Sequence, residues 1–247
     1  MKPRRAPWKT EFPDVFIVAD ESAVKRHADY HAGKTGDASA AARLVQAMVP
    51  DAAIERVRVA LAGHAPILAS VHAAEAEGIN AIPEALADLL AQRLSLRTDD
   101  TLVQINVVNH TGAGGFDRLA RQALFAGDVA TGAEYFLVDD FIGQGGTLAN
   151  LRGFVEMAGA KVIGALALTG KPFSAKIAPS AEQLQALRRK HGQLEDWWRE
   201  HFGFGFDALT HSEARYLERT ADAHTIRDRV VAAQQAADSG HRQGDPQ

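Results

Sequence analysis

The chain has 247 residues, 46% of them hydrophobic and 23% charged, and its net charge of −4 at pH 7 rules out a uniformly basic coat for nucleic acid. The absence of cysteine excludes disulfides, cysteine zinc sites, iron–sulfur clusters and thiol catalysis. No apolar run approaches the roughly 20 residues of a membrane span, and the charged N-terminus lacks the apolar segment of a signal peptide. We therefore expect a cytoplasmic protein that binds neither membranes nor nucleic acid.

Short apolar runs alternate with longer amphipathic stretches, which is typical of parallel strands joined by crossover helices. Most runs are continuous Val, Ile and Leu, indicating strands covered on both faces. The predicted strands are Val15–Ala19, Ile67–Val71, Leu102–Val108, Tyr135–Val138 and Val162–Leu168. Apolar residues at helical spacing predict a helix over Ile82–Leu94. The fold class expected from this order is α/β, with a doubly wound parallel sheet.

The two ends of the chain lack this alternation. Residues 1–60 are expected to form a mostly helical arm with at most one strand, starting with a disordered basic stretch, and residues 61–172 form the core. Residues 173–237 are expected to be a helical appendage and residues 238–247 a disordered tail. The helices predicted in the appendage are Ala181–Lys190, Leu194–His201, Ser212–Arg219 and Ala223–Ala236.

One segment, Glu134–Gly164, carries the strongest functional signal. An apolar strand ends in Asp139 and Asp140, a glycine-rich loop follows, and Thr147 opens a helix. In an open parallel sheet the carboxyl ends of the strands face the ligand crevice. Glycines at a helix start let backbone N–H groups converge on an anion. Two carboxylates for hydroxyls or a divalent cation, beside a phosphate-binding loop, predict a phosphorylated sugar as ligand.

The run VDDFIGQGGT, from Val138 to Thr147, resembles the signature of the type I phosphoribosyltransferases, which is two acids followed by a loop of the form TGGT. Gln144 replaces the threonine that usually precedes the two glycines, so one hydroxyl donor is lost while the backbone donors and an amide remain. A tight strand–helix turn without ligand is the alternative interpretation. A receiver domain fits less well, because its acid pair lies near its N-terminus.

The resemblance covers about residues 64–170 and is nearest to the ComF-like branch. It places a pyrophosphate loop at Ile67–Asn80, with Ser70, Val71 and His72 as ligand-binding residues. It also places a flap at Asn106–Phe125, in which Arg118 is a further ligand-binding residue. Ser70–Asn80 has no Arg or Lys and contains two glutamates, so phosphate binding there would depend on backbone N–H groups, His72, Mg²⁺ and flap arginines.

The resemblance also implies roles at the central motif. Asp139 and Asp140 would be catalytic, holding the ribose hydroxyls directly or through Mg²⁺ and stabilising an oxocarbenium-like state. Gly143, Gln144, Gly145, Gly146 and Thr147 would anchor the 5′-phosphate, while Phe141 and Ile142 would wall the base pocket. The expected ligand is phosphoribosyl pyrophosphate or a ribose 5-phosphate-type molecule, the expected cofactor Mg²⁺, and the expected reaction phosphoribosyl transfer to or from a nitrogenous acceptor, as in nucleotide metabolism. A homodimer is a further expectation. A non-catalytic sensor of a ribose 5-phosphate-type ligand is the alternative.

Weaker signals have plain structural explanations. Gly33–Thr35 is similar to part of a P-loop but lacks the earlier glycine, so a turn in which Asp37 caps the next helix is expected. His27 and His31, spaced i, i+4, are expected on a solvated helix surface, with a pair of metal ligands as the alternative. Asp99 and Asp100 are expected in a polar turn, and His110 in the flap is left open between ligand contact and loop structure. The aromatic cluster between Trp197 and Phe206 is expected to dock the appendage on the core or on a second subunit.

Overall fold

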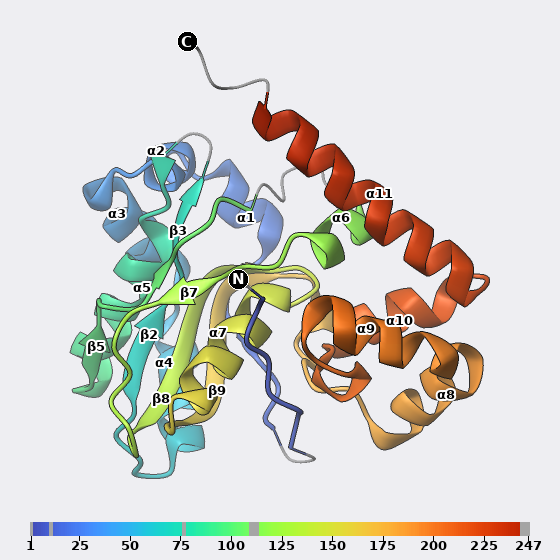
Figure 1. Cartoon of the computed structure of the whole chain (residues 1–247). Coiled ribbons are helices and arrows are strands. Elements are labelled where there is room, and N and C mark those ends of the chain that lie inside the picture. Colours follow the sequence, from blue (N-terminus) through green and yellow to red (C-terminus); the bar gives the residue numbers. More distant parts are fainter. Residues whose placement is uncertain (1, 10–11, 76–77, 109–113, 243–247) are drawn as a thin grey trace.

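A five-stranded parallel sheet forms the centre of the computed structural model, which describes residues 2–9, 12–75, 78–108 and 114–242 (Figure 1). The strand order is β1-β9-β8-β2-β5, and every neighbouring pair is parallel. The strands are β1 (Phe16–Ile17), β2 (Ile67–Ser70), β5 (Arg97–Asp99), β8 (Glu134–Ile142) and β9 (Lys161–Gly170). The predicted α/β class is confirmed.

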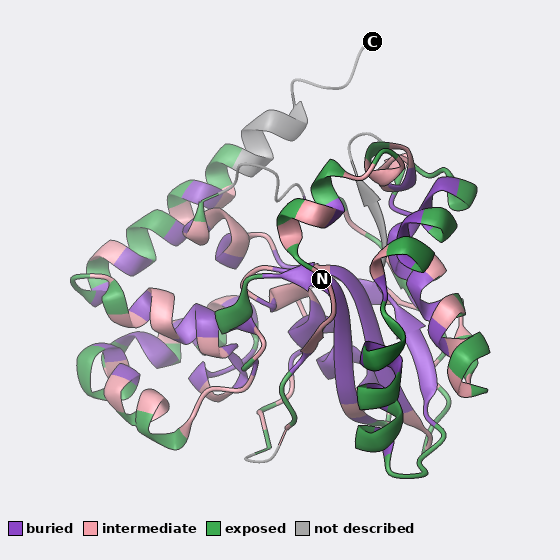
Figure 2. Cartoon of the chain, turned by 180° about the vertical axis from the view of Figure 1, so that it is seen from behind, coloured by how far each residue is buried: buried purple, intermediate pink, exposed green. Residues whose placement is uncertain are grey.

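Helices cover both faces of this sheet. One face packs against α1 (Glu21–Arg26), α2 (Tyr30–Lys34), α3 (Ala38–Met48), α4 (Asp51–Leu61) and α5 (Ile82–Leu94), and the other against α7 (Gly146–Met157). Because α5 joins β2 to β5 and α7 joins β8 to β9 on opposite faces, the sheet is doubly wound. The strands are correspondingly buried, while the helices expose their outer surfaces (Figure 2).

The burial of β8 explains its continuous apolar sequence. Tyr135 and Leu137 pack in the cluster on the α7 face, whereas Phe136 and Val138 pack in the cluster on the α5 face. Successive residues of a strand point to opposite faces, so a strand covered on both sides has no polar alternation. The strand continues beyond the predicted end at Val138 as far as Ile142, which pairs with Gly170 of β9.

The prediction for Leu102–Val108 is wrong. Only β6 (Val103–Gln104) is a strand there, and it belongs to a second sheet of order β4-β3-β6-β7 with β3 (His72–Glu75), β4 (Gly78–Ile79) and β7 (Phe125–Ala126). The outer position of the main sheet is taken instead by β5, which includes Asp99, a residue expected in a turn. A short edge strand is paired on one side only, so it can be polar and gives no apolar signal.

Helices form the C-terminal part of the chain, as expected. They are α8 (Ala181–His191), α9 (Glu195–Phe202), α10 (His211–Arg219) and α11 (Ala223–Arg242), with 3-10 turns at Pro172–Ser174, Gly192–Leu194 and Phe206–Ala208. Their common core contains Trp198, Phe202, Phe204 and Phe206 together with Phe116 and Leu119 of α6 (Gly115–Ala120). The aromatic cluster therefore packs the appendage against α6 of the core, which was one of the two surfaces expected for it. The helix α11 continues to Arg242, into the residues expected to form a disordered tail, and residues 243–247 lie outside the described residues.

The expectation of a disordered basic start is wrong for residues 2–5. The N-terminal segment runs between the core and the C-terminal helices (Figure 1), and Arg5 is buried there. Its guanidinium donates to Asn150 Oδ1 at 2.6 Å and to Glu213 Oε2 at 2.6 Å. Because Asn150 and Glu213 are far from Arg5 along the chain, no local sequence pattern indicates that this basic segment is buried. No helix among the described residues is both long and apolar enough to cross a membrane.

Candidate functional site

The candidate site lies where the direction of winding changes, between β2 and β8. The first of these strands is followed by a helix on one face and the second by a helix on the other, and ligands of such sheets bind at the carboxyl ends of the strands at this point. Val71 N donates to Val138 O at 2.9 Å, so the end of β2 lies directly beside the acid pair. A cavity of about 780 Å³ opens there, within the size range of small-molecule sites.

Asp139 and Asp140 line this cavity from the last part of β8. They continue the two rows of the strand, so Asp139 follows the α7-facing residues and Asp140 the α5-facing ones. Both are buried, and Asp140 N donates to Asp139 Oδ1 at 2.8 Å. Burial, and then the adjacent Asp140 carboxylate, raise the pKa of Asp139 well above its ordinary value. Two partly desolvated carboxyl groups thus face one cavity.

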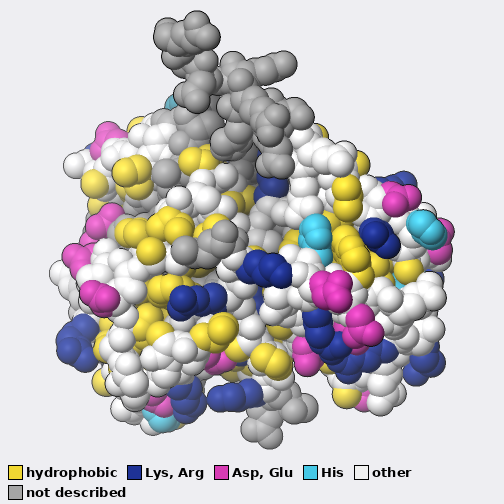
Figure 3. Space-filling model, viewed as in Figure 1, with side chains coloured by type: hydrophobic (Ala, Val, Ile, Leu, Met, Phe, Trp, Pro, Cys, Tyr) yellow, Lys and Arg dark blue, Asp and Glu magenta, His cyan; other side chains and the backbone are white. Residues whose placement is uncertain are grey.

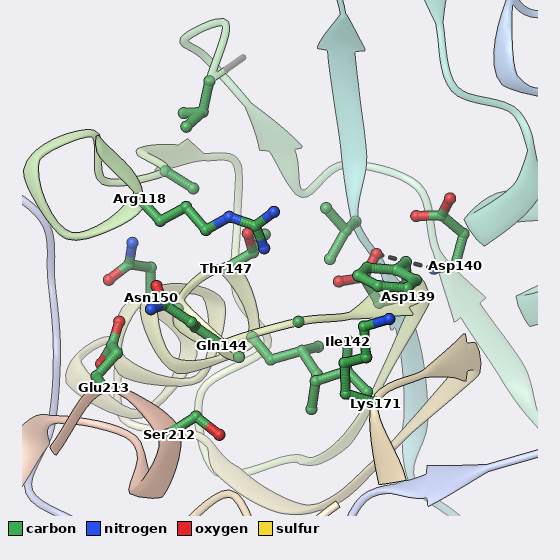
Figure 4. Close-up of a pocket in the computed structure, with 18 of the residues that line it drawn as sticks. Arg118, Asp139, Asp140, Ile142, Gln144, Thr147, Asn150, Lys171, Ser212 and Glu213 are labelled. Carbon is green, nitrogen blue, oxygen red and sulfur yellow. Dashed lines mark hydrogen bonds between the residues drawn. The ribbon is translucent and has the colours of Figure 1, made fainter. Parts of the chain in front are cut away.

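The glycine-rich loop forms the adjoining wall. Gly145 is the N-cap of α7 with φ of +80°, a left-handed conformation that favours glycine, and the helix begins one residue before Thr147. The first N–H groups of a helix have no intrahelical acceptor, and the helix dipole adds positive potential. Gly143–Thr147, which contains the N-terminus of α7, therefore lines the same cavity as the acids (Figure 4).

The C-terminal appendage supports this loop from behind. Thr210 Oγ1 donates to Gln144 O at 2.6 Å, and Ser174 Oγ donates to Gly143 O. The Gln144 Oε1 atom is buried and has no hydrogen-bond partner among the described residues. Glu213 also lines the cavity, and a Cβ added at Gly146 would lie 2.8 Å from its Oε1. The loop is consequently fixed by residues that belong to another part of the chain.

Glu213 is neutralised by the N-terminal segment. Arg5 Nη1 and Nη2 donate to its two carboxylate oxygens at 2.6 and 2.8 Å, which is a bidentate pair with both side chains buried. Arg5 Nη2 also donates to Gln122 Oε1 at 2.8 Å, next to the flap helix. Because the carboxylate is engaged by Arg5, Glu213 does not place an unpaired negative charge behind the anion-binding loop.

Most residues predicted for the site meet at the cavity. Those that line it are Asp139, Asp140, Phe141, Ile142, Gly143, Gln144, Gly145, Gly146, Thr147, Val71 and Arg118. Arg118 lies close to the loop, since a Cβ added at Gly143 would lie 2.7 Å from its Nη1. Ser70 is instead buried within the sheet, and it does not line the cavity. His72 belongs to β3, but its side chain lies outside the described residues, as does all of His110.

Lys34 is the main site residue that sequence reasoning missed. Its Nζ lies 3.0 Å from Asp140 Oδ2, on the cavity wall. The turn after α2 holds it there, because Ala81 N donates to Gly33 O at 3.0 Å and Gly78 packs against Thr35. The expected turn is confirmed, since the Asp37 side chain accepts from Ala40 N. Lys34 belongs to Gly33–Thr35, the run that is similar to part of a P-loop but was interpreted as a turn. No local sequence pattern connects this lysine to Asp139 and Asp140.

Other missed residues come from the strand ends and the appendage. Lys171, which immediately follows β9, could have been found because it lies at the carboxyl edge of a central strand. Asn150 also lines the cavity from the first turns of α7, whereas Arg215 and Arg219 reach it from α10 through the packing of the appendage.

The fold and this site define a doubly wound α/β protein with an acid pair and a glycine-rich loop at one switch point. No family model matches the chain. It is 38% identical over 234 residues to Protein TraN of Escherichia coli, covering 94% of this chain and 52% of TraN. It is 34% identical over 151 residues to an uncharacterized protein of Haemophilus influenzae, covering 61% of this chain and 34% of that protein. The chain thus spans about half the length of TraN and about a third of the length of the second relative.

Solved structures with partial likeness are phosphoribosyltransferases. Adenine phosphoribosyltransferase from Thermoanaerobacter pseudethanolicus aligns with a TM-score of 0.35 and 21% identity over 53% of this chain and 71% of that one. The enzyme from Leishmania tarentolae aligns with a TM-score of 0.36 and 16% identity over 60% of this chain and 76% of that one. Neither sequence relative is described as ComF-like, so the expected placement in that branch has no support from them.

Proposed function

We propose that this chain binds a phosphoribosyl ligand at the described cavity and transfers its phosphoribosyl group to or from a nitrogenous acceptor. The observation that carries this proposal is that Asp139, Asp140 and the loop Gly143–Thr147 line one cavity at the switch point of a doubly wound sheet. A phosphate on the loop and a ribose on the acids is the arrangement for which these groups are chemically suited.

The acids would act on the reacting sugar. Displacement at the anomeric carbon develops positive charge on the ribose ring, and carboxylates in a buried position stabilise that charge more strongly than in water. Holding the 5′-phosphate on the loop would fix the ring against the acids, so that binding energy is used for orientation. Phe141, which also lines the cavity, would cover one side of the site and exclude water.

Mg²⁺ fits these residues as an ion delivered with the ligand. No cluster of three or more His, Cys, Asp or Glu side chains suited to a metal occurs among the described residues, while Asp139 and Asp140 supply two carboxylates on the cavity. Mg²⁺ commonly uses one or two carboxylates together with substrate phosphates. When bound, it would neutralise pyrophosphate charge.

Lys34 supplies the cation that the first loop lacks. Ser70–Asn80 contains no Arg or Lys, yet the Lys34 ammonium lies beside Asp140 and shares the cavity wall with Val71 and Asn80, at the two ends of that loop. We assign Lys34 to the pyrophosphate group of the ligand, where its charge would compensate for the acidic character of the loop.

A non-catalytic sensor is the second candidate. The glutamates of the first loop favour it, because they oppose a pyrophosphate there without affecting the 5′-phosphate loop. The two candidates differ in whether the pyrophosphate group adds affinity.

Calorimetric titration of the full chain with phosphoribosyl pyrophosphate and with ribose 5-phosphate, each with and without Mg²⁺, tests both. The enzyme proposal predicts tighter binding of the pyrophosphate ligand, dependent on Mg²⁺. Equal affinity for the two ligands supports the sensor, and binding of neither contradicts both.

A further inference from the structure

One wall of the cavity is built from arginines of the flap and the appendage. Arg121 directly follows α6, and Arg215 and Arg219 are one turn apart on α10; we call these three residues the arginine wall. The Phe116 and Tyr216 rings, 5.0 Å apart in an edge-on contact, hold the two helices against each other. This contact joins the flap to the appendage, and arginines of both line the cavity.

The arginine wall differs from the rest of the cavity in its charge balance. Among the described lining residues there are seven Lys or Arg and four Asp or Glu side chains, in a protein whose net charge is −4. The lysines are compensated, since Lys34 pairs with Asp140 and Lys171 pairs with Glu21 at 2.6 Å. Within the described part of the chain, the arginine wall makes no ion pair with a carboxylate.

Two side chains of the arginine wall, Arg121 and Arg215, are partly withdrawn from solvent by the protein around them. Arg121 Nε is buried and lacks a hydrogen-bond partner among the described residues, and a buried donor without an acceptor is unfavourable. The Arg215 guanidinium lies 4.2 Å from the centre of the Phe173 ring, which restricts its orientation. On the face drawn in Figure 3, Lys and Arg side chains lie at the boundary between the core and the C-terminal helices, together with Asp and Glu side chains.

We propose that the arginine wall is a second oxyanion subsite, which takes a phosphate group in addition to the one at Gly143–Thr147. This inference rests on the proposed function of the same cavity. Arg118, which precedes the wall on the flap helix, extends toward Thr147, while Asp139 and Asp140 lie together on the other side of the view (Figure 4). A ligand with its ribose at the acids and its phosphate at the loop therefore leaves the arginine wall for a further phosphate. Bidentate guanidinium recognition suits that group.

The extra phosphate has two chemical sources that the wall would recognise alike. It is either the next phosphate of the same ligand, as in a nucleoside 5′-diphosphate, or a phosphate of the second substrate.

The test uses the full chain and inorganic phosphate as probe. Ribose 5-phosphate is first titrated alone, and phosphate is then titrated into the saturated protein by calorimetry. We expect one additional phosphate, with affinity reduced about tenfold or more in Arg121→Gln, Arg215→Gln or Arg219→Gln, since each removes a charge-assisted contact. Arg219 is exposed, so its replacement should leave the fold intact, and exposed Arg56→Gln on α4 is the matched control expected to change nothing.

The outcomes separate this inference from the proposed function. Failure of ribose 5-phosphate to bind contradicts the proposed function itself. Normal binding of ribose 5-phosphate with no additional phosphate, or with a phosphate that the three variants leave unchanged, overturns the second subsite alone. Titration with AMP and ADP then identifies the source. Tighter binding of ADP that depends on the arginine wall assigns the phosphate to the same ligand, whereas inorganic phosphate binding equally beside AMP and ADP assigns it to the second substrate.

Discussion

Lys34 Nζ and Asp140 Oδ2 lie 3.0 Å apart across the cavity wall, joining the end of a short N-terminal helix to the acid pair of the central strand. The pair gives the ligand cavity a cation beside a carboxylate at the point where a ribose and its pyrophosphate would meet. Replacing the lysine therefore tests which part of the ligand it contacts.

Lys34→Met is expected to weaken binding of phosphoribosyl pyrophosphate about tenfold or more, because a charge-assisted contact to phosphate is lost, and to affect ribose 5-phosphate much less. Lys34→Arg should retain most of the difference between the two ligands. Calorimetry with both ligands measures this ratio. An equal loss for both ligands would show that Lys34 acts only by positioning Asp140.

Asp139→Asn is expected to weaken ligand binding without destabilising the folded protein. The asparagine keeps an Oδ1 acceptor for Asp140 N, but it loses the charge that would hold ribose hydroxyls, so ribose 5-phosphate affinity should fall about tenfold to a hundredfold. Burial disfavours the charged form of Asp139, as its raised pKa indicates, so the unfolding midpoint in urea should be unchanged or higher.

Asp139→Asn combined with Asp140→Asn should abolish ligand binding in a folded protein. Asp128→Asn, at an exposed position, is the control expected to alter neither binding nor stability. Normal ribose 5-phosphate binding by the double variant would refute the assignment of the acids.

His191 is expected to make stability depend on pH. It is fully buried, both ring nitrogens lack hydrogen-bond partners among the described residues, and burial lowers its pKa below 6.5. The unfolded chain therefore takes up the proton more readily than the folded one, and the stability present above pH 6.5 is lost as the pH falls below it. The slope for one such group cannot exceed about 1.4 kcal/mol per pH unit.

Urea unfolding at pH 7.5 and 5.5 measures this effect. His191→Leu should lose less stability on acidification than the wild type, although His211, whose pKa burial also lowers, will retain part of the slope. His224→Gln, at an exposed position, should follow the wild type. Identical pH dependence of the wild type and His191→Leu would contradict the prediction.

Gly153→Ala is expected to reverse the usual effect of alanine in a helix. Within α7 the change should stabilise by about 1 kcal/mol on helix propensity alone. Here the added Cβ would lie 2.2 Å from Arg4 O and 2.4 Å from Arg5 Cα, so the N-terminal segment must be displaced. We expect a loss of about 2 kcal/mol or more in urea unfolding, of the size seen for overpacked cores. A stabilised Gly153→Ala variant would show that the segment does not pack tightly on α7.

Local patterns predicted much of the core. The apolar spacing located α5 at its observed bounds, Ile82–Leu94, and the strand that carries the acid pair was found, although β8 continues past the acids to Ile142. These features were accessible because strand burial, helix amphipathicity and turn chemistry depend on neighbouring residues. By contrast, β5 was missed, because an exposed edge strand of three residues needs no apolar run.

The positions of Lys34 and Arg5 could not be predicted in this way. Lys34 lies beside Asp140 because Gly33 packs against Ala41 and Ile82 of other helices. Arg5 is buried because Glu213 and Asn150 are buried opposite it. Each is an ordinary basic residue in its own sequence context. Their roles arise from contacts between segments far apart in the chain, for which a single sequence offers no signal.

The Arg5–Glu213 pair has a consequence for the order in which the molecule can be assembled. The two residues are 208 positions apart, so the residue that neutralises Glu213 behind the anion-binding loop emerges from the ribosome long before its partner. Closing so long a loop is entropically costly, and contacts of this separation slow folding. The sheet can pair from β1 to β9 without them, but the wall behind Gly146 is completed only after α10 has been synthesised. Acquisition of ligand binding should therefore trail formation of the sheet during folding.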